Sequence, residues 1–402
     1  MERRTITRMA LLALATAVLA AAGCSSGTHA DHKAEALDRW NAARSGINYG
    51  LAVQQFEVGE LNKAQRTIVK TLEASPDEPR YHVLAARIAL EKGELERAFR
   101  HLELATEADP TFAPGHYYMG VVFQRWQQYD KALQAYELSY KHDPENVDGL
   151  IAVGEMLVKL GRPDQAVARL SEKLVYFEHN ASLRLSIARI HLKQRNMDKA
   201  LEAFREAYLL VPDDVVVLEQ LAMAEYAAGA FSEAIYHLSQ LLEDEQMSGR
   251  RDLRLALGDC YQRTDRPVLA RKIFMELTHE DPTDVAAWIK LGQAAKIVGD
   301  RVRLAEAAKM VRSLEPQRPE GHLLAGMVAE VNGDNAQAIA AYTRAAEADP
   351  TTALPHILIG LVHERSGDFE AATAAYSRAT KVDPDDARAR RLLAGLQAAA
   401  TP

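Results

Sequence analysis

Side chains that could do chemistry are scattered through the chain, and their spacing argues against a catalytic or metal centre. His363 and Glu364 begin like the zinc-protease sequence HExxH, but Gly367 stands where that motif needs its second histidine. The chain has no GxxxxGK[ST] phosphate loop and no GxGxxG sequence that follows a strand. We therefore expect no enzymatic activity, no catalytic residue, no cofactor and no metal.

Histidine recurs at one position of a repeated sequence unit, as His82, His116, His322 and His356. A zinc ion needs ligands within about 2.1 Å of it, whereas equivalent residues on successive helices lie about 10 Å apart. A packing role is therefore favoured over a metal site, and Trp288 occupies the same position in another unit. Cys260 lies two residues after a packing glycine, so we interpret it as a buried structural thiol.

Cys24 differs from Cys260 because it follows an apolar segment at the start of the chain. Residues 1–8 are basic and residues 9–22 are apolar. The apolar run is shorter than the roughly 20 residues that span a bilayer but fits the core of a signal peptide. The sequence AAGC resembles the bacterial lipobox, which implies a signal peptide over 1–23 and diacylation of Cys24. Ordinary secretion with cleavage near Ala22 is the alternative.

The lipobox resemblance implies a place in the bacterial cell envelope. The protein would be lipid-anchored, for example by palmitate, and would face the periplasm or the exterior. Ser25 after the cysteine favours the outer membrane if the organism is Gram-negative. The small polar residues over 24–30 predict a flexible tether.

The elements that must position these side chains repeat every 34 residues. The period is marked by prolines that close most units: Pro76, Pro110, Pro144, Pro212, Pro282, Pro316, Pro350 and Pro384. Glu178 takes one proline place, and two extra residues lie between Pro212 and Pro282. Ten units start at Ser45, Pro79, Ala113, Val147, Ala181, Val215, Arg251, Val285, Pro319 and Ala353.

Three positions of the unit have a steric meaning. Position 8 is Gly or Ala in all ten units and position 20 is Ala in nine, as expected where two helices cross closely. Position 15 is Gly in seven units, which suits a left-handed residue at the end of a helix. This pattern resembles the tetratricopeptide repeat family over residues 45–386. The resemblance implies an all-α fold, a right-handed α-solenoid of about ten repeats.

The ends and irregularities of the array carry further expectations. Residues 31–44 predict an N-terminal capping helix with Trp40 buried, and residues 387–402 a C-terminal capping helix and tail. The two-residue insertion falls in 242–251, which is either a longer loop or a hinge. In the eighth unit Leu304 replaces the small residue of position 20, so its second helix is the weakest prediction.

The binding surface is expected on the first helices. In this family, positions 2, 5, 9 and 12 line the concave face. The predicted protein-binding groove comprises Tyr49, Val53, Phe56, Arg87, Tyr117, Val121, Glu155, Arg189, Met223, Asp259, Met327 and Leu361. Core packing is the alternative role of position 5. No Lys or Asn occurs at positions 5 and 9, so a carboxylate clamp known in some family members is not expected.

These observations favour a non-enzymatic, membrane-anchored scaffold that binds a protein partner through its groove. The family resemblance implies a role in assembly of an envelope, pilus or secretion complex. An accessory or regulatory subunit of an envelope enzyme or polysaccharide exporter is the alternative. The net charge of −8 argues against a general nucleic-acid binder, which needs a basic face.

Overall fold

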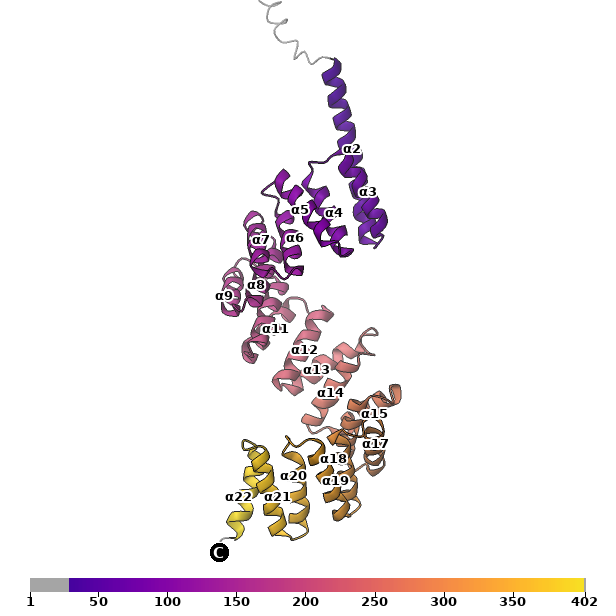
Figure 1. Cartoon of the computed structure of the whole chain (residues 1–402), viewed down its shortest axis with the longest axis vertical. Helices are drawn as coiled ribbons and strands as arrows, with labels where there is room; N and C mark the ends of the chain where they lie inside the picture. The colour runs from indigo at the N-terminus through magenta and orange to yellow at the C-terminus, as the bar shows by residue number, and fades with distance from the viewer. Residues whose placement is uncertain (1–28, 401–402) are drawn as a thin grey trace, which may run out of the picture. The chain divides into compact units, whose positions relative to one another are not determined.

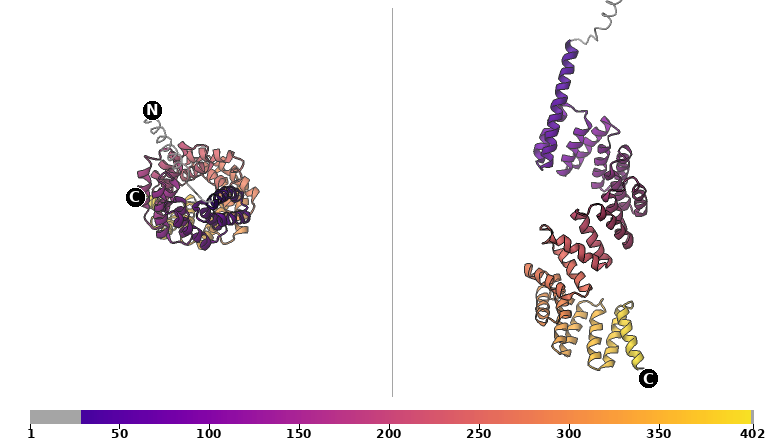
Figure 2. Two further views of the ribbon diagram at one scale, coloured as in Figure 1. Left: turned by 90° about the horizontal axis from the view of Figure 1, so that it is seen from above. Right: turned by 180° about the vertical axis from the view of Figure 1, so that it is seen from behind.

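The computed structural model describes residues 29–400 and contains 21 α-helices and no strand over that range, which confirms the all-α prediction. The chain divides into two compact units, Met1–Glu178 and His179–Pro402. Each helix pairs with the next one through a short turn, so both units consist of successive helical hairpins (Figures 1 and 2).

The first unit contains four hairpins. Its helices are α2 (His29–Glu57), α3 (Leu61–Ala74), α4 (Pro79–Glu91), α5 (Leu95–Ala108), α6 (Ala113–Arg125), α7 (Tyr129–His142), α8 (Val147–Lys159) and α9 (Pro163–Lys173). The first helices of neighbouring hairpins also contact one another, α2 with α4 and α4 with α6. This contact places side chains of successive first helices on one surface.

The second unit contains six hairpins and a final single helix. Its helices are α10 (Ala181–Lys193), α11 (Met197–Leu210), α12 (Val215–Ala228), α13 (Phe231–Glu243), α14 (Arg251–Arg263), α15 (Pro267–Glu280), α16 (Val285–Val298), α17 (Arg301–Leu314), α18 (Pro319–Val331), α19 (Asn335–Ala348), α20 (Leu354–Arg365), α21 (Phe369–Val382) and α22 (Ala387–Ala400).

Small residues at position 8 let a large side chain of the partner helix lie directly on the backbone. A Cβ atom added to Gly120 would lie 2.6 Å from the ring of Tyr136, and one added to Gly326 would lie 2.3 Å from the ring of Tyr342. Both tyrosine rings are buried. At Gly120 and Gly326 the packing leaves no room for a methyl group, so these two hairpins require glycine.

The residue at position 15 has a left-handed backbone conformation in every repeat. The seven glycines there have φ between 75° and 81°. Gln127, Arg195 and Asp265 hold the same position with φ of 60°, 61° and 57°. The predicted helix end is therefore a property of the turn, and glycine is the residue that adopts it with least strain.

The eighth hairpin is regular despite its unusual sequence. Its second helix, α17, forms over the expected residues, with Leu304 buried. Ala308 stands where other repeats have a bulky side chain, and Leu324 of the next repeat fills the space: a Cβ on Gly292 would lie 2.6 Å from it. The large residue has thus moved to a neighbouring helix.

The N-terminal end differs from the prediction. Residues 31–44 do not form a separate capping helix, because α2 continues without a break into the first helix of the first repeat. Trp40 is 64% exposed, so the prediction that its ring is buried is wrong. No described helix precedes α2, so nothing in the described chain covers that ring.

The C-terminal end lies against its neighbours. Leu392 of α22 packs on a buried cluster that includes Ile357, Ala379 and Ala389. Arg388 and other α22 arginines are exposed. The last repeat thus has a helix on its outer side, whereas α2 has none among the described residues.

Candidate protein-binding groove

A hollow of about 420 Å³ opens on the first unit between the first helices of successive hairpins. It is lined by Tyr49, Arg80, Val83, Leu84, Arg87, Phe112, Pro114, Tyr117, Tyr118, Asn146 and Asp148. These residues come from α2, α4, α6 and the start of α8, including two residues that immediately precede a helix. The hollow is therefore shared by four repeats.

The ring of Tyr49 and the guanidinium of Arg80 form one wall, with the buried ring of Tyr81 behind them. The rings of Tyr49 and Tyr81 lie 5.1 Å apart, and the guanidinium of Arg80 lies 5.6 Å from each ring centroid. Arg80 also donates to Glu78 at 2.7 Å, and this hydrogen bond raises its pKa. The cation and the rings hold one another in place, each contact contributing about 0.5–1 kcal/mol at an exposed site.

Arg87 occupies a second cation–aromatic site. Its guanidinium lies 4.8 Å from the ring centroid of Phe56 and 5.5 Å from that of Tyr118. Within the described part of the chain, no carboxylate forms an ion pair with Arg87. The guanidinium is thus positioned by rings while its hydrogen-bond donors stay available to a carboxylate or a backbone carbonyl of a ligand.

Tyr117 forms the other side of the hollow. Its ring makes an edge contact with Tyr118 at 5.3 Å and a tilted contact with Tyr136 at 5.4 Å. Burial, with a smaller contribution from Asp148, raises the pKa of Tyr117, so its hydroxyl remains a hydrogen-bond donor at neutral pH. Asn146 caps α8 by accepting from the backbone N–H of Asp148 at 3.0 Å. The hollow thus offers rings, two cations and one carboxylate.

The predicted residues of the first unit have different positions. Tyr49, Arg87 and Tyr117 line the hollow, and Phe56 contacts Arg87. Val53 and Val121 are half-buried against core clusters, and Glu155 is exposed on α8 outside the hollow. The residues that the prediction missed are Arg80, Val83, Leu84, Phe112, Pro114, Tyr118, Asn146 and Asp148. Arg80, Pro114 and Asp148 all hold position 2, so that position was the available signal.

In the second unit the predicted residues join repeats to one another. Asp259 accepts hydrogen bonds from the hydroxyl of Tyr226 at 2.8 Å and from Nζ of Lys290 at 2.5 Å. Arg189 donates to Gln220 at 2.7 Å. Met223, Met327 and Leu361 are half-buried against core clusters.

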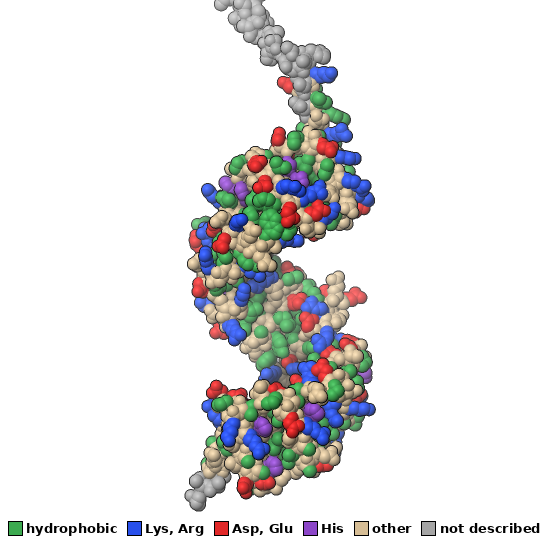
Figure 3. Space-filling model, in the orientation of Figure 1, with side chains coloured by type: hydrophobic (Ala, Val, Ile, Leu, Met, Phe, Trp, Pro, Cys, Tyr) green, Lys and Arg blue, Asp and Glu red, His purple; other side chains and the backbone are tan. Residues whose placement is uncertain are grey.

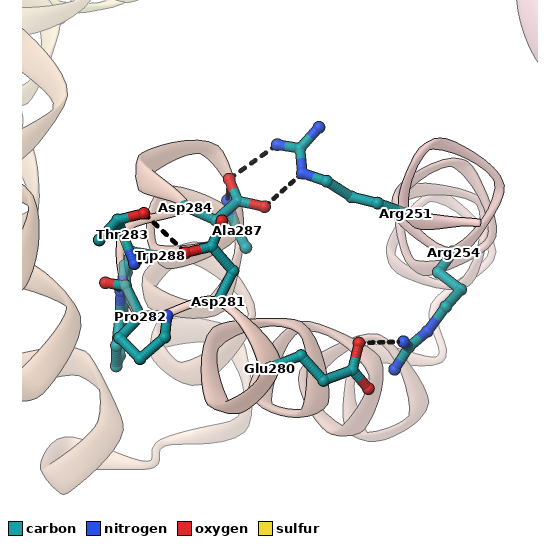
Figure 4. A network of polar contacts seen from close by, with 9 residues as sticks. All are labelled: Arg251, Arg254, Glu280, Asp281, Pro282, Thr283, Asp284, Ala287 and Trp288. Atoms are coloured by element: carbon teal, nitrogen blue, oxygen red, sulfur yellow. Dashed lines mark hydrogen bonds and ion pairs between the residues drawn. The ribbon is translucent and has the colours of Figure 1, made fainter. Parts of the chain in front are cut away.

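Further ion pairs join neighbouring helices of the second unit. Arg251 at the start of α14 donates at 2.7 Å to Asp284, which also caps α16 (Figure 4). This arginine is the main cause of the lowered pKa of Asp284. Arg254 donates to Glu280 of α15 at 2.5 Å. On the visible face of the molecule, acidic and basic side chains are interspersed (Figure 3).

A larger hollow of about 810 Å³ in the second unit contains none of the predicted residues. It lies between α17, α18 and α19, and its basic lining residues are Lys309, Arg312, His322 and Arg344. Burial and the two arginines lower the pKa of His322. Its other walls are mainly alanine, so it offers no aromatic anchor.

The remaining candidate residues have structural positions. The imidazole Nε2 of His82 forms a hydrogen bond of 2.6 Å with the backbone carbonyl of Pro76. The indole N–H of Trp288 donates to the backbone carbonyl of Pro282 at 2.9 Å. The residue at position 4 therefore joins the first helix of its repeat to the preceding turn. Cys260 is buried, and burial raises its pKa to about 12. Among residues 29–400 no group of three or more His, Cys, Asp or Glu side chains is placed to hold a metal.

The membrane-related predictions concern the start of the chain. Cys24, the predicted site of lipid attachment, lies outside the described residues. No helix in the described range combines the length and the apolar character needed to cross a bilayer.

Comparisons with known proteins agree with the repeat architecture. Two family models, both described as tetratricopeptide repeat, match the chain: one over residues 225–295 and 332–396, the other over residues 49–111, 154–215 and 302–353. No curated protein matches the chain.

Several solved structures are similar to parts or most of the chain. A thermophilic TPR protein of Thermus thermophilus is 20% identical, with 45% of this chain and 98% of that chain covered and a TM-score of 0.39. Pseudomonas aeruginosa PilF is 17% identical, with 50% and 92% covered and a TM-score of 0.44. Yeast Tom70 is 13% identical, with 89% of each chain covered and a TM-score of 0.43. The chain belongs to the tetratricopeptide repeat family.

Proposed function

We propose that this protein is a lipid-anchored, non-catalytic scaffold that holds a segment of another protein in the hollow of its first unit. The observation that carries the proposal is a cluster in which Arg80 and Arg87 lie against four aromatic rings and a fifth ring, that of Tyr117, contacts Tyr118, with Arg87 unpaired by any described carboxylate. Rigid rings give large contact areas at little entropic cost, and arginine is enriched with them at protein-binding hot spots. Tetratricopeptide repeats are protein-binding modules, which supports the same class of ligand.

The chemistry of the hollow defines the ligand. It fits an extended or helical protein segment with apolar anchors, a carboxylate for Arg87 and a basic group for Asp148. A polyanion is disfavoured because Asp148 and the partner of Arg80, Glu78, lie at the same surface. The anchor at Cys24 would hold this surface at the envelope membrane, where assembly of an envelope, pilus or secretion complex is the process that we propose it serves.

The ligand can be tested by photocrosslinking in the native envelope. A benzoylphenylalanine in place of Glu155, which is exposed and close enough for its charge to act on Tyr117 of the hollow, should form an adduct with another protein. Tyr49→Ala with Tyr117→Ala should reduce that adduct at least tenfold, because such anchors contribute about 1–3 kcal/mol each. The same crosslinker at Leu209, an exposed position of α11, is the control and should not give this adduct.

Two results would reject the groove as the binding site. One is an adduct that survives the double substitution. The other is a melting temperature that collapses in the double variant, which would make the two rings part of the core. The anchor is tested separately: Cys24→Ser should move the folded protein from the membrane to the soluble fraction, and unchanged membrane association would refute lipid attachment.

A further inference from the structure

An apolar row runs along the face of α2 that points away from its own hairpin. Leu37, Trp40, Ile47 and Leu51 are 56%, 64%, 75% and 45% exposed. Their spacing of three, seven and four residues places them on one side of a helix. Single exposed apolar residues are ordinary, but an aligned row of four on one helix indicates an interaction surface.

The later repeats show what normally covers this face. Ile47 holds position 3, where Val217 is 2% exposed and Leu253 is fully buried. At the same position a Cβ on Gly115 would lie 3.1 Å from Thr106 of α5, the second helix of the preceding repeat. A Cβ on Gly321 would likewise lie 2.9 Å from Arg312 of α17. Position 3 is therefore a contact with the preceding repeat.

Position 7 gives the same result. Leu51 holds this position in the first repeat, whereas Leu221 and Leu291 hold it in later repeats and are at most 1% exposed. Ile47 and Leu51 thus form one half of a repeat-to-repeat interface, and no described segment supplies the other half. The shape that fits this half is an α-helix packed alongside α2.

The length of α2 indicates how much of that helix is needed. It has 29 residues, whereas α3 beside it has 14, and its N-terminal half projects past its partner (Figures 1 and 2). Leu37 and Trp40 lie on this extension, and the row from Leu37 to Leu51 is about 21 Å long. Exposed small residues, Ala36, Ala43 and Gly50, run beside the row and allow a second helix to approach closely.

The charge of the row selects the partner. Lys33 and Arg44 are exposed on the same side of α2, and the row contains no acidic residue. Elsewhere in the array, neighbouring repeats are joined by opposite charges, such as Lys290 with Asp259 at 2.5 Å. The covering helix should therefore present carboxylates to Lys33 and Arg44.

The same charges disfavour a second copy of this chain as the covering element. Two α2 helices packed antiparallel about the centre of the row would place Arg44 against Arg44. The C-terminal helix of a second copy is no better, because α22 exposes Arg388, Arg390 and Arg391. Like charges that face one another across an interface reduce affinity.

We propose that this row of α2 is a docking site for an amphipathic helix of another protein, with aliphatic residues over Leu37, Trp40, Ile47 and Leu51 and with acidic residues toward Lys33 and Arg44. The bound helix takes the place of a preceding repeat. This site is independent of the hollow in the first unit, and Tyr49→Ala with Tyr117→Ala leaves it intact.

The test uses the full chain carrying Cys24→Ser and two dye-labelled synthetic helices. Both peptides have leucine on one face, and they differ only in flanking glutamate or lysine. Fluorescence anisotropy should show binding of the glutamate peptide and weaker binding of the lysine peptide. The double substitution Trp40→Ser with Ile47→Ser should reduce the affinity for the glutamate peptide at least tenfold. The melting temperature should not change, because both side chains are exposed.

Charge reversal and a matched control make the result specific. Lys33→Glu with Arg44→Glu should reverse the preference in favour of the lysine peptide. Leu209→Ser, which removes an exposed leucine of α11, should change neither affinity.

Two other results would show a different occupant of the row, and each would overturn the proposal. The first is concentration-dependent self-association that disappears with Ile47→Ser, which would identify a second copy. The second is flotation with phosphatidylglycerol vesicles that depends on Trp40 and Ile47, which would identify a lipid surface. Failure of the glutamate peptide to bind, or binding that ignores the substitutions, also rejects the site.

Discussion

Glu155 in the first unit and Asp259 in the second hold the same repeat position, carry the same charge and have different surroundings. Glu155 is exposed, and within the described part of the chain it makes no ion pair. Asp259 is half-buried and accepts hydrogen bonds from Tyr226 and Lys290. Position 9 therefore faces solvent in one repeat and joins two repeats in another.

The difference lies in the neighbouring repeats, not in the position itself. Lys290 holds position 6 of the repeat that follows Asp259, and Tyr226 holds position 12 of the repeat before it. In the sequence, Gln124 holds position 12 of the repeat before Glu155 and Ser186 holds position 6 of the repeat after it, and neither residue is a cation. A side chain is free to bind a ligand only if adjacent repeats do not supply its partner.

The largest expected effect on stability separates these two carboxylates. Asp259→Ala should lower the free energy of unfolding by about 1–3 kcal/mol, because the Lys290 ammonium and the Tyr226 hydroxyl both lose their acceptor. Glu155→Ala should change it by less than about 0.5 kcal/mol, as exposed substitutions do. Urea unfolding followed by circular dichroism measures both variants, and equal losses would contradict the comparison.

An effect of pH on stability is expected from the histidines of position 4 and their neighbours. In the first unit, the Nδ1 atoms of His82 and His101 lie 3.3 Å apart. Burial, then the charges of His82, Arg97 and Arg100, lower the pKa of His101 to about 4. In the second unit, burial followed by the charge of Arg378 lowers the pKa of His356, and no second histidine contributes.

The lowered pKa of His101 predicts that stability depends on pH. An unfolded histidine takes up its proton near its ordinary pKa of 6.5, well above the folded value for His101. The unfolded chain therefore binds more protons between these values, and the free energy of unfolding should fall as the pH is lowered from about 6.5 to about 4. His101→Gln should reduce this slope, measured by urea unfolding at several pH values. An unchanged slope would show that His101 is not its source.

Most of the fold can be predicted from the sequence because local and repeated constraints agree. The small residue of position 8, the left-handed residue of position 15 and the 34-residue period each have a steric cause that acts within one hairpin. Leu324 shows the limit: it fills the space left by Ala308 from the next repeat, which a position-by-position comparison does not reveal. The exposed Trp40 is another limit, since its burial requires a preceding helix that the described chain lacks.

The candidate groove was less predictable for the same reason. Tyr49, Arg87 and Tyr117 line the hollow, whereas Arg189 and Asp259 are engaged by neighbouring repeats. Their engagement depends on residues about 31–33 positions away in the sequence. A single repeat considered alone contains no information on that contact. The residues of position 2, such as Arg80, were the part of the site that the family pattern could have supplied.

The last comparison concerns two junctions that lack the usual proline. The first, residues 174–180, follows α9 and exposes Val175 and Tyr176. The second, residues 242–251, contains the two-residue insertion for which the sequence allows a hinge. The structure gives the second junction several supports. Met247 packs on the core shared by α13 and α14, and Asp244 accepts from the backbone N–H of Gln246 at 2.8 Å.

Arg250 adds an ion pair that the first junction lacks. Its guanidinium contacts Glu219 of α12 at 2.8 Å and Asp252 at 2.7 Å. A hydrogen bond between charged groups contributes about 1.5–3 kcal/mol when it is well formed, and less where solvent screens it. We therefore expect amide hydrogen exchange at 242–251 to be roughly tenfold slower than at 174–180. Arg250→Gln should remove most of that difference without affecting exchange at 174–180. Exchange at 242–251 as fast as at 174–180 in the unmodified chain would instead favour a hinge at the insertion, because the contacts of Met247 and Arg250 would then be too weak to hold it.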